Sequence, residues 1–271
     1  MYIQLISIHG LIRGEKIEMG RDSDTGGQVR YVLELARTLG KMKGVTQVDL
    51  FTRRVRDKRV EPEYGEDIEE IGPNCRIVRL PCGGGRYMRK ERLWPFLDDF
   101  ADAMITFIRK EGRVPDLVHG HYADAGYIAT EVSSAFGVPF AFTGHSLGRD
   151  KKNYLVSQGW SSEHMNKEFN IDRRIDAEEK ALASADLVVT STRHERDTQY
   201  KHYYNGDAPE FAVIPPGTEL ERFFPYYEYE VAPDNVGEYW KQARMRMQAE
   251  LERFHFNADR PLILALCRPD K

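Results

Sequence analysis

Residues 22–39 read DSDTGGQVRYVLELARTL and follow a short apolar run at residues 3–8, from which a loop separates them. The apolar residues of this stretch recur at spacings of three and four: Val32, Leu35, Ala36 and Leu39. Residues with that spacing share one face of a helix, so the face must be buried. A buried strand, a glycine-containing loop and an amphipathic helix, in this order, predict the first unit of a parallel α/β sheet.

The same alternation continues along the chain and predicts one large domain at residues 1–217. Further apolar runs predict strands at residues 48–52, 76–80, 116–119, 139–143, 187–191 and 212–214. Amphipathic segments predict helices near residues 95–110, 125–136, 173–184 and 195–203. The predicted fold class is therefore α/β, a Rossmann-like doubly wound parallel sheet.

The pattern changes after Pro215, Pro216 and Gly217. An aromatic and acidic stretch, followed by a charged helix near residues 237–254, predicts a linker and helix at residues 218–260. Residues 261–271 carry a new buried-strand signal. We expect them to be the first strand of a second domain that is truncated in this sequence.

The composition excludes several classes of protein. With 41% hydrophobic and 30% charged residues the chain is typical of a soluble globular protein, and a net charge of -4 favours no nucleic-acid partner. Three cysteines without a CxxC pair indicate reduced thiols, neither a disulfide framework nor a zinc knuckle. No segment approaches the roughly 20 apolar residues of a membrane span, and no secretory leader is evident. We therefore expect a cytoplasmic protein without a membrane partner.

The loop before the first helix is the first candidate binding site, because ligands of open α/β sheets bind beyond the carboxyl ends of the strands. Asp24 or Thr25 can cap the helix. Gly26 and Gly27 then expose backbone N–H groups at its positive end, where a phosphate or a sugar hydroxyl can approach, and Gln28 can hydrogen-bond a sugar. The alternative is an ordinary N-cap with a flexible glycine pair.

Histidines follow two later strands. His119 and His121 lie two apart, which on a strand puts both rings on one face. They could chelate a metal, but a third ligand at a useful spacing is missing, so we predict no metal site. His121 or Tyr122 is expected to line the cleft, and His145 in the loop at residues 143–149 is a second cleft candidate. A Ser-His nucleophile at residue 146 is disfavoured, because its loop lacks a glycine-flanked elbow.

Two groups of basic residues are candidates for holding a phosphate. Lys90 lies between Arg89 and Arg92, after a glycine-rich stretch at residues 83–85, and Arg173 and Arg174 begin a predicted helix. Guanidinium groups match phosphate geometry with paired hydrogen bonds. Isolated exposed arginines are often only solvated charges. This pair, however, lies at the N-terminal end of the helix, where the helix dipole favours negative charge, so the arginines do not stabilise the helix and a binding role is favoured.

Several motifs occur in an order that resembles one known family: HGLIRGE at residues 9–15, GRDSDTGGQVRYVLELAR at 20–37, HGHYADAGYIA at 119–129, TGHSLGRDK at 143–151, IDAEEKAL at 175–182 and VIPPG at 213–217. Over most of its length the chain resembles the N-terminal domain of the sucrose-phosphate synthases, which are retaining family-4 glycosyltransferases of the two-domain GT-B fold. The resemblance implies transfer of glucose from UDP-glucose to fructose 6-phosphate, giving sucrose 6-phosphate, with no metal or other cofactor.

The resemblance also implies roles for the candidate residues. Gly26, Gly27 and Gln28 fall on the loop that approaches the donor phosphates and the acceptor sugar. Lys90, with one or both of Arg173 and Arg174, falls where the acceptor phosphate is held. His121 and His145 fall near the transferred glucose, as the catalytic candidates, and Arg268 matches a basic residue of the donor diphosphate site. We expect this sequence to be mainly the acceptor half, weak or inactive by itself. The residues make no prediction of its oligomeric state.

Three other functions remain open at this stage. Sucrose synthases share the GGQ loop but take free fructose, so they need no phosphate clamp of the kind that Arg173 and Arg174 suggest. Mannosylfructose-phosphate synthases take the same acceptor with a GDP-mannose donor, which the second domain would select. A module that only binds a sugar phosphate, without catalysis, is the non-enzymatic alternative.

Overall fold

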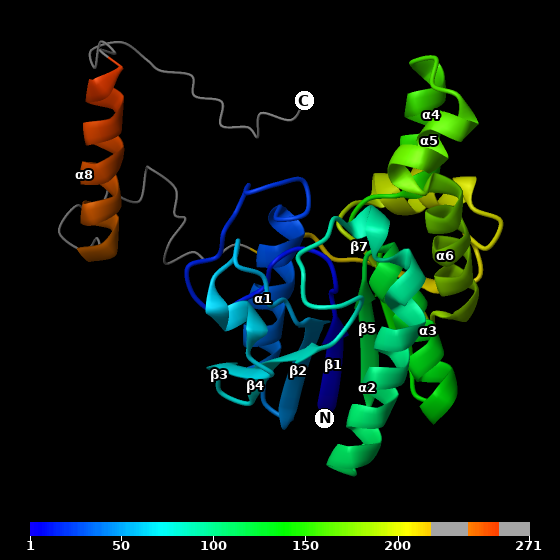
Figure 1. The fold of residues 1–271 in the computed structure, drawn as a ribbon, viewed down its shortest axis with the longest axis horizontal. Helices are drawn as coiled ribbons and strands as arrows, with labels where there is room; N and C mark the ends of the chain where they lie inside the picture. Colours follow the sequence, from blue (N-terminus) through cyan, green and yellow to red (C-terminus); the bar gives the residue numbers. More distant parts are fainter. Residues whose placement is uncertain (218–237, 255–271) are drawn as a thin grey trace. The chain divides into compact units, whose positions relative to one another are not determined.

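A computed structural model of the chain describes residues 1–217 and 238–254 (Figure 1). The chain divides into two compact units, Met1–Pro215 and Pro216–Lys271. Of the second unit, the described element is helix α8 (Glu238–Arg253), which lies where a charged helix is predicted. The predicted linker at residues 218–237, the predicted strand at 261–271 and Arg268 lie outside the described residues.

An eight-stranded sheet forms the centre of the first unit, in the order β3-β4-β2-β1-β5-β6-β7-β8. Its strands are β1 (Tyr2–Ile6), β2 (Gln47–Arg53), β3 (Ile68–Gly72), β4 (Cys75–Leu80), β5 (Leu117–His121), β6 (Phe140–Thr143), β7 (Leu187–Thr190) and β8 (Glu210–Val213). Every neighbouring pair is parallel except β3 and β4. The predicted α/β class with a mostly parallel sheet is confirmed.

Helices of three or more turns connect the parallel strands: α1 (Gly27–Gly40), α2 (Leu97–Glu111), α3 (Ala123–Phe136) and α6 (Ile171–Ser184). Shorter helices are α4 (Gly148–Ser157) and α5 (Ser162–Phe169), with single turns at Pro62–Gly65, Lys90–Arg92 and Trp94–Phe96. The predicted helix at 195–203 is instead a π-helical turn, Glu195–Gln199, followed by a 3₁₀ turn, Tyr200–His202.

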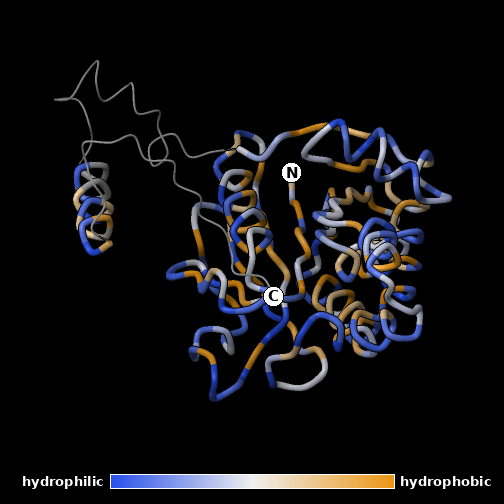
Figure 2. Tube along the Cα trace, turned by 90° about the horizontal axis from the view of Figure 1, so that it is seen from above, coloured by the Kyte–Doolittle hydropathy of each residue, from blue (hydrophilic) through white to orange (hydrophobic). Residues whose placement is uncertain are grey.

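Each face of the sheet is buried by different helices, because successive strand side chains point to opposite faces. Leu5 of β1 joins a core with Val32 of α1, whereas Ile6 joins a core with Phe100 of α2 and Ile128 of α3. Figure 1 shows α1 on one side of the strands and α2 and α3 on the other. In Figure 2 the N-terminal strand is mostly hydrophobic and the loops at the rim are mostly hydrophilic. The sheet is doubly wound, as predicted.

The candidate site is positioned by the point where the strand order reverses. β1 lies between β2 and β5, so the connection after β1 and the connections leading to β5 run to opposite sides. A crevice opens beyond the carboxyl ends of the strands at such a point. The loops after β1, β5 and β6 therefore meet at one edge of the sheet.

Besides the single turns, one strand and two α-helices were not predicted, and each has a weak apolar pattern. β3 is an acidic edge strand, IEEIG, whose residues are exposed or only partly buried. In α4 only Gly148 and Leu155 are buried, and in α5 only Met165. Segments that bury so few side chains leave little periodicity in the sequence.

Candidate functional site

The first helix of the site begins at an open glycine pair. Gly26 is the N-cap of α1 and forms no side-chain cap hydrogen bond, so the predicted cap by Asp24 or Thr25 is wrong. A methyl group added at Gly27 would meet no atom within 4 Å. Gln28 donates from Nε2 to Ser7 Oγ at 3.2 Å and to the His121 carbonyl at 3.4 Å. The helix start is thus open to a ligand and is joined to the end of β5.

A row of histidines lies beside this helix start. The His119 and His121 rings share one face of β5, as predicted, with centroids 4.1 Å apart. His119 Nε2 lies 2.9 Å from Thr143 Oγ1, and His121 Nδ1 lies 3.1 Å from His145 Nε2. Two of the residues predicted for the cleft, His121 and His145, are therefore in direct contact.

These imidazoles are held in their neutral form. Burial lowers the pKa of His119 to about 4. Burial, with His119 and His145 nearby, lowers the pKa of His121 well below its usual range. His145 keeps exposed surface, but its ring packs edge-on against Tyr31 with centroids 5.0 Å apart, and this loss of water together with His119 lowers the pKa of His145. At neutral pH these uncharged imidazoles can therefore form hydrogen bonds with a ligand.

The Nε2 atom of His121 is buried and has no hydrogen-bond partner within residues 1–217. An unmet buried polar atom is costly, so a ligand group or a water is its expected partner. In the described ranges, 1–217 and 238–254, no three His, Cys, Asp or Glu side chains are grouped so that they could hold a metal ion.

Tyr122 has a strained backbone next to these histidines. Its φ of 79° and ψ of 168° fall in a region that glycine alone occupies readily. The Tyr122 N–H donates to the Thr143 carbonyl at 2.8 Å, and the phenol ring lies between His9, at 4.7 Å edge-on, and the Arg174 guanidinium, at 4.5 Å. This backbone conformation therefore accompanies an aromatic ring that lies between His9 and the Arg174 guanidinium.

A narrow cavity beyond Tyr122 gathers positive charge. It has a volume of about 10 Å³ and is lined by Lys90, Glu91, Trp94, Tyr122, Asp124, Lys151, Phe169 and Arg174. We call it the cationic cavity. Lys90 is tied to the buried Asp24 through its backbone N–H, at 2.8 Å, and its Nζ, at 2.5 Å. Burial alone would lower the pKa of Lys90, but Asp24 and Glu91 outweigh it and raise the pKa.

Hydrogen bonds to Glu178 and Ser146 fix the Arg174 side chain, which also lines the cationic cavity. Its Nε donates to Glu178 at 2.9 Å, and its Nη2 donates to the Ser146 carbonyl at 2.7 Å and to Ser146 Oγ at 3.1 Å. Its Nη1 has no hydrogen-bond acceptor within residues 1–217. Burial tends to lower the pKa of Arg174, but Glu178 outweighs it and raises the pKa, so the group stays charged.

Lys151 was not predicted, although it ends the TGHSLGRDK motif. It lies in α4, and its Nζ sits 3.3 Å from the centre of the Phe169 ring. Burial, with Arg174 and Lys90 nearby, lowers its pKa to about 8. Within residues 1–217 no carboxylate pairs with it. A lysine beside two other cations, with no carboxylate paired to it, is a group that an anion would stabilise.

Comparison with known proteins bears on these features. Residues 26–217 match the family model of a glycosyl transferase 4-like domain. The chain belongs to this glycosyltransferase family. It is 42% identical to a probable sucrose-phosphate synthase of Solanum tuberosum and 41% identical to a sucrose-phosphate synthase of Zea mays, each match covering 100% of this chain. The chain spans about 30% of the length of these relatives.

A solved structure is also similar to this glycosyltransferase domain. A sucrose-phosphate synthase from Thermosynechococcus elongatus matches with a TM-score of 0.65 and 28% identity, over 86% of this chain and 52% of that chain. The predicted GT-B class is confirmed. No helix in the described part of the chain is long and apolar enough to cross a bilayer.

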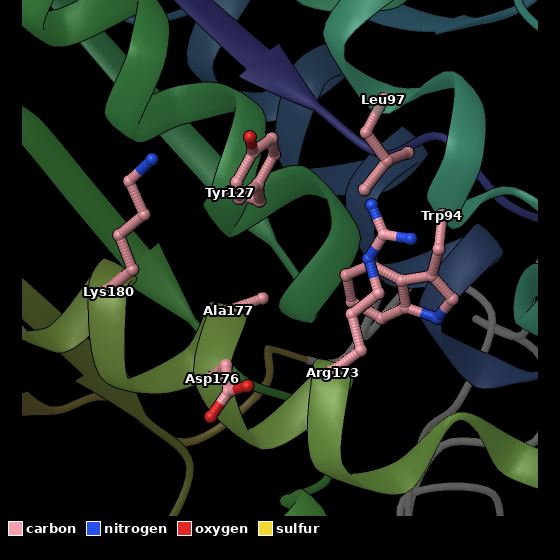
Figure 3. Close-up of a pocket in the computed structure, with 7 residues that line it drawn as sticks. All are labelled: Trp94, Leu97, Tyr127, Arg173, Asp176, Ala177 and Lys180. Atoms are coloured by element: carbon pink, nitrogen blue, oxygen red, sulfur yellow. The ribbon is translucent and has the colours of Figure 1, made fainter. Parts of the chain in front are cut away.

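The arginine pair of this glycosyltransferase domain is divided between two cavities. Arg174 lines the cationic cavity. Arg173 instead lines a second cavity, to which Trp94 also contributes (Figure 3). Adjacent residues of an α-helix point about 100° apart, so they cannot face one ligand equally. The prediction was that one or both arginines hold the acceptor phosphate; of the two, Arg174 lines the cationic cavity and Arg173 does not.

The site of the glycosyltransferase domain thus has two chemically different parts. The open start of α1 and the neutral histidines offer hydrogen bonds suited to sugar hydroxyls. The cationic cavity offers charged donors suited to a phosphate. Tyr122 lies between these two parts. Trp94 and Glu178 were missed from the sequence, because neither lies in a loop that directly follows a strand.

Proposed function

We propose that the protein is the acceptor-binding part of a sucrose-phosphate synthase. The whole enzyme would transfer glucose from UDP-glucose to fructose 6-phosphate with retention, giving sucrose 6-phosphate. The observation that carries the proposal is the cationic cavity, where Lys90, Lys151 and Arg174 meet next to the open start of α1. Similarity to the sucrose-phosphate synthases supports the same reading.

The phosphate of fructose 6-phosphate would enter the cationic cavity. A volume of about 10 Å³ holds at most one water, so Lys90 or Lys151 must move to admit the phosphate. Lys90 would turn from Asp24, and Lys151 from the Phe169 ring. The two lysines and the free N–H groups of Arg174 would then surround the phosphate with charge-assisted hydrogen bonds.

The sugar ring would lie towards α1 and the histidines. Gln28 and the N–H groups at Gly26 and Gly27 can meet its hydroxyls, and the unpartnered Nε2 of His121 suits one more. His121 and His145 would face the transferred glucose as neutral hydrogen-bonding groups. The donor diphosphate would be bound largely by residues outside the described ranges, with Arg268 as a candidate.

Two further expectations belong to this proposal. The reaction would need no metal ion or other cofactor, because the cations of the protein would serve the anionic substrates, and its rate in a chain that includes the donor domain should survive EDTA. A cytoplasmic location is supported by the reduced, buried Cys75 and Cys82. Cell fractionation would test that location.

Calorimetric titration with fructose 6-phosphate and with fructose tests the function. We expect the phosphorylated sugar to bind more tightly, and Lys151→Gln to remove most of the preference. Lys152→Gln is the matched control, because Lys152 pairs with Asp172 outside the cationic cavity. Equal binding of the two sugars would favour a sucrose synthase instead. An unchanged preference in Lys151→Gln would overturn the assignment of the phosphate to this cavity.

A further inference from the structure

A second cavity lies beneath one face of α6 and shares with the cationic cavity one lining residue, Trp94. Its volume is about 230 Å³. The α6 residues that line it recur at spacings of three and four, as neighbours on one helix face do: Arg173, Asp176, Ala177 and Lys180. Trp94, Leu97 of α2 and Tyr127 of α3 form the remaining wall (Figure 3). We call it the α6 cavity.

The floor of the α6 cavity is apolar. Trp94, Leu97 and Ala177 each line it, although their side chains are at most 5% exposed. Figure 3 shows the Arg173 side chain reaching over the Trp94 indole, and the guanidinium carbon lies 6.0 Å from the centre of the indole. A ligand seated here would contact an aromatic surface and a guanidinium together.

Of the three charged side chains that line the α6 cavity, one already forms an ion pair. Lys180 forms an ion pair with Glu131 and lies 4.6 Å from the centre of the Tyr127 ring. The side chains of Arg173 and Asp176, in contrast, are exposed and have neither a hydrogen bond nor an ion pair within residues 1–217. The cavity therefore presents one free cation and one free carboxylate above an aromatic floor.

We propose that the α6 cavity binds a small hydroxylated carboxylate of the sugar-acid class. Its carboxylate would pair with the fork of Arg173, a hydroxyl would donate to Asp176, and its carbon skeleton would cover Trp94. Guanidinium groups bind carboxylates through two parallel hydrogen bonds. The volume, about 230 Å³, lies below the roughly 300–1,000 Å³ of drug-sized sites, so the occupant is small.

The charge of the lining favours a carboxylate over a phosphate. Arg173, Lys180 and Asp176 sum to one positive charge, which matches a monoanion. A phosphate monoester carries about -1.5 to -2 charges at neutral pH and would face Asp176 as well. The cationic cavity also contains two carboxylates, Glu91 and Asp124, but three cations line it, so it offers one more cationic donor to a phosphate than the α6 cavity does. This inference does not depend on the proposed function.

Calorimetric titration of the 271-residue protein with gluconate tests the proposal. Gluconate should bind the unaltered protein, and Arg173→Gln should weaken its binding about tenfold or more, because a charge-assisted pair is lost. Arg109→Gln is the matched control, since Arg109 is an exposed arginine at the far end of α2 and leaves gluconate binding unchanged. Absence of gluconate binding, or equal binding by Arg173→Gln, would overturn the site.

Two further arms separate the cavities and the ligand classes. Lys151→Gln removes a cation of the cationic cavity and should leave gluconate binding unaltered. Loss of gluconate binding in Lys151→Gln but not in Arg173→Gln would place the carboxylate in the cationic cavity and overturn the proposal. Fructose 6-phosphate should bind Arg173→Gln as well as it binds the unaltered protein. A tenfold loss for that phosphate in Arg173→Gln would overturn the carboxylate class.

Discussion

Arg174 donates from Nε to Oε1 of Glu178 at 2.9 Å, and both side chains are buried. The same carboxylate accepts from the N–H of Gly148, at 2.9 and 3.1 Å, and from the hydroxyl of Tyr203. One buried acid thus joins α6, the start of α4 and the turn near Tyr203. It fixes the arginine of the cationic cavity, and through α4 it also fixes the helix that carries Lys151.

Replacing this acid should therefore be costly. Glu178→Ala leaves the Arg174 charge buried without its partner, and such a loss lowers the free energy of unfolding by about 3–5 kcal/mol. Glu131→Ala is the control, because Glu131 pairs with Lys180 at the surface, where an ion pair contributes below about 1 kcal/mol. Urea denaturation of both variants measures the difference. Equal losses would contradict a structural role for Glu178.

A second prediction uses two glycines in contrasting surroundings. Gly27→Ala meets no atom within 4 Å, so the stability of the protein should stay the same or rise slightly, while fructose 6-phosphate affinity falls about tenfold or more. Gly126→Ala would bring its methyl within 2.6 Å of Phe142 Cε2 and should destabilise the protein by about 1–3 kcal/mol. Thermal unfolding and sugar titration of each variant check this. A destabilised Gly27→Ala with normal affinity would refute the open helix start.

The strands and the site loops could be predicted because they depend on local sequence. Buried parallel strands are continuous apolar runs, and ligands bind near the loops that follow them, so Gln28, His121 and His145 could be predicted to lie together, as the structure shows. Lys151 could not be found in this way, because its significance comes from Arg174 and Lys90, which are distant in the sequence.

The arginine pair shows a different limit. Two adjacent basic residues resemble a single clamp in the sequence, yet a helix directs them to different surfaces. Arg174 is held by Glu178, one turn later on the same helix, whereas Arg173 reaches over Trp94. The helical period shows that Arg173 and Arg174 point in different directions. The three-dimensional packing is needed to show that Arg174 is the one that lines the cationic cavity.

The buried histidines predict an acid-sensitive fold. His119 has a pKa of about 4 in the folded protein, against about 6.5 when unfolded, so the unfolded chain binds more protons between those pH values. The stabilisation is complete above pH 6.5 and is lost as the pH falls towards 4. From pH 7 to pH 5 this group alone should lower the free energy of unfolding by about 2 kcal/mol.

Urea denaturation at the two pH values measures this loss, and the variant His119→Gln isolates it. Its free energy of unfolding should depend less on pH over the same interval, even though the variant is less stable at pH 7 because its hydrogen bond to Thr143 is altered. The same pH dependence in both proteins would show that His119 already takes up its proton in the folded state.

Lys151 predicts that ligand binding weakens as the pH rises, whereas His119 predicts that the fold loses stability as the pH falls. Burial, Arg174 and Lys90 lower its pKa to about 8 in the free protein, so its charge is lost as the pH rises past 8. A bound phosphate would restore the pKa towards its ordinary value of about 10.4. Binding above pH 8 would then require proton uptake, and fructose 6-phosphate affinity should fall about tenfold between pH 7 and pH 9.

Lys151→Gln should remove this fall, because glutamine does not titrate, and its affinity should be low and nearly constant over the same interval. Titrations in two buffers of different ionisation enthalpy would detect the proton taken up at pH 9 directly. The phosphate of the ligand is fully ionised above pH 8, so it contributes little to the change. An equal fall in the variant would assign the pH dependence to another group and would remove Lys151 from contact with the phosphate.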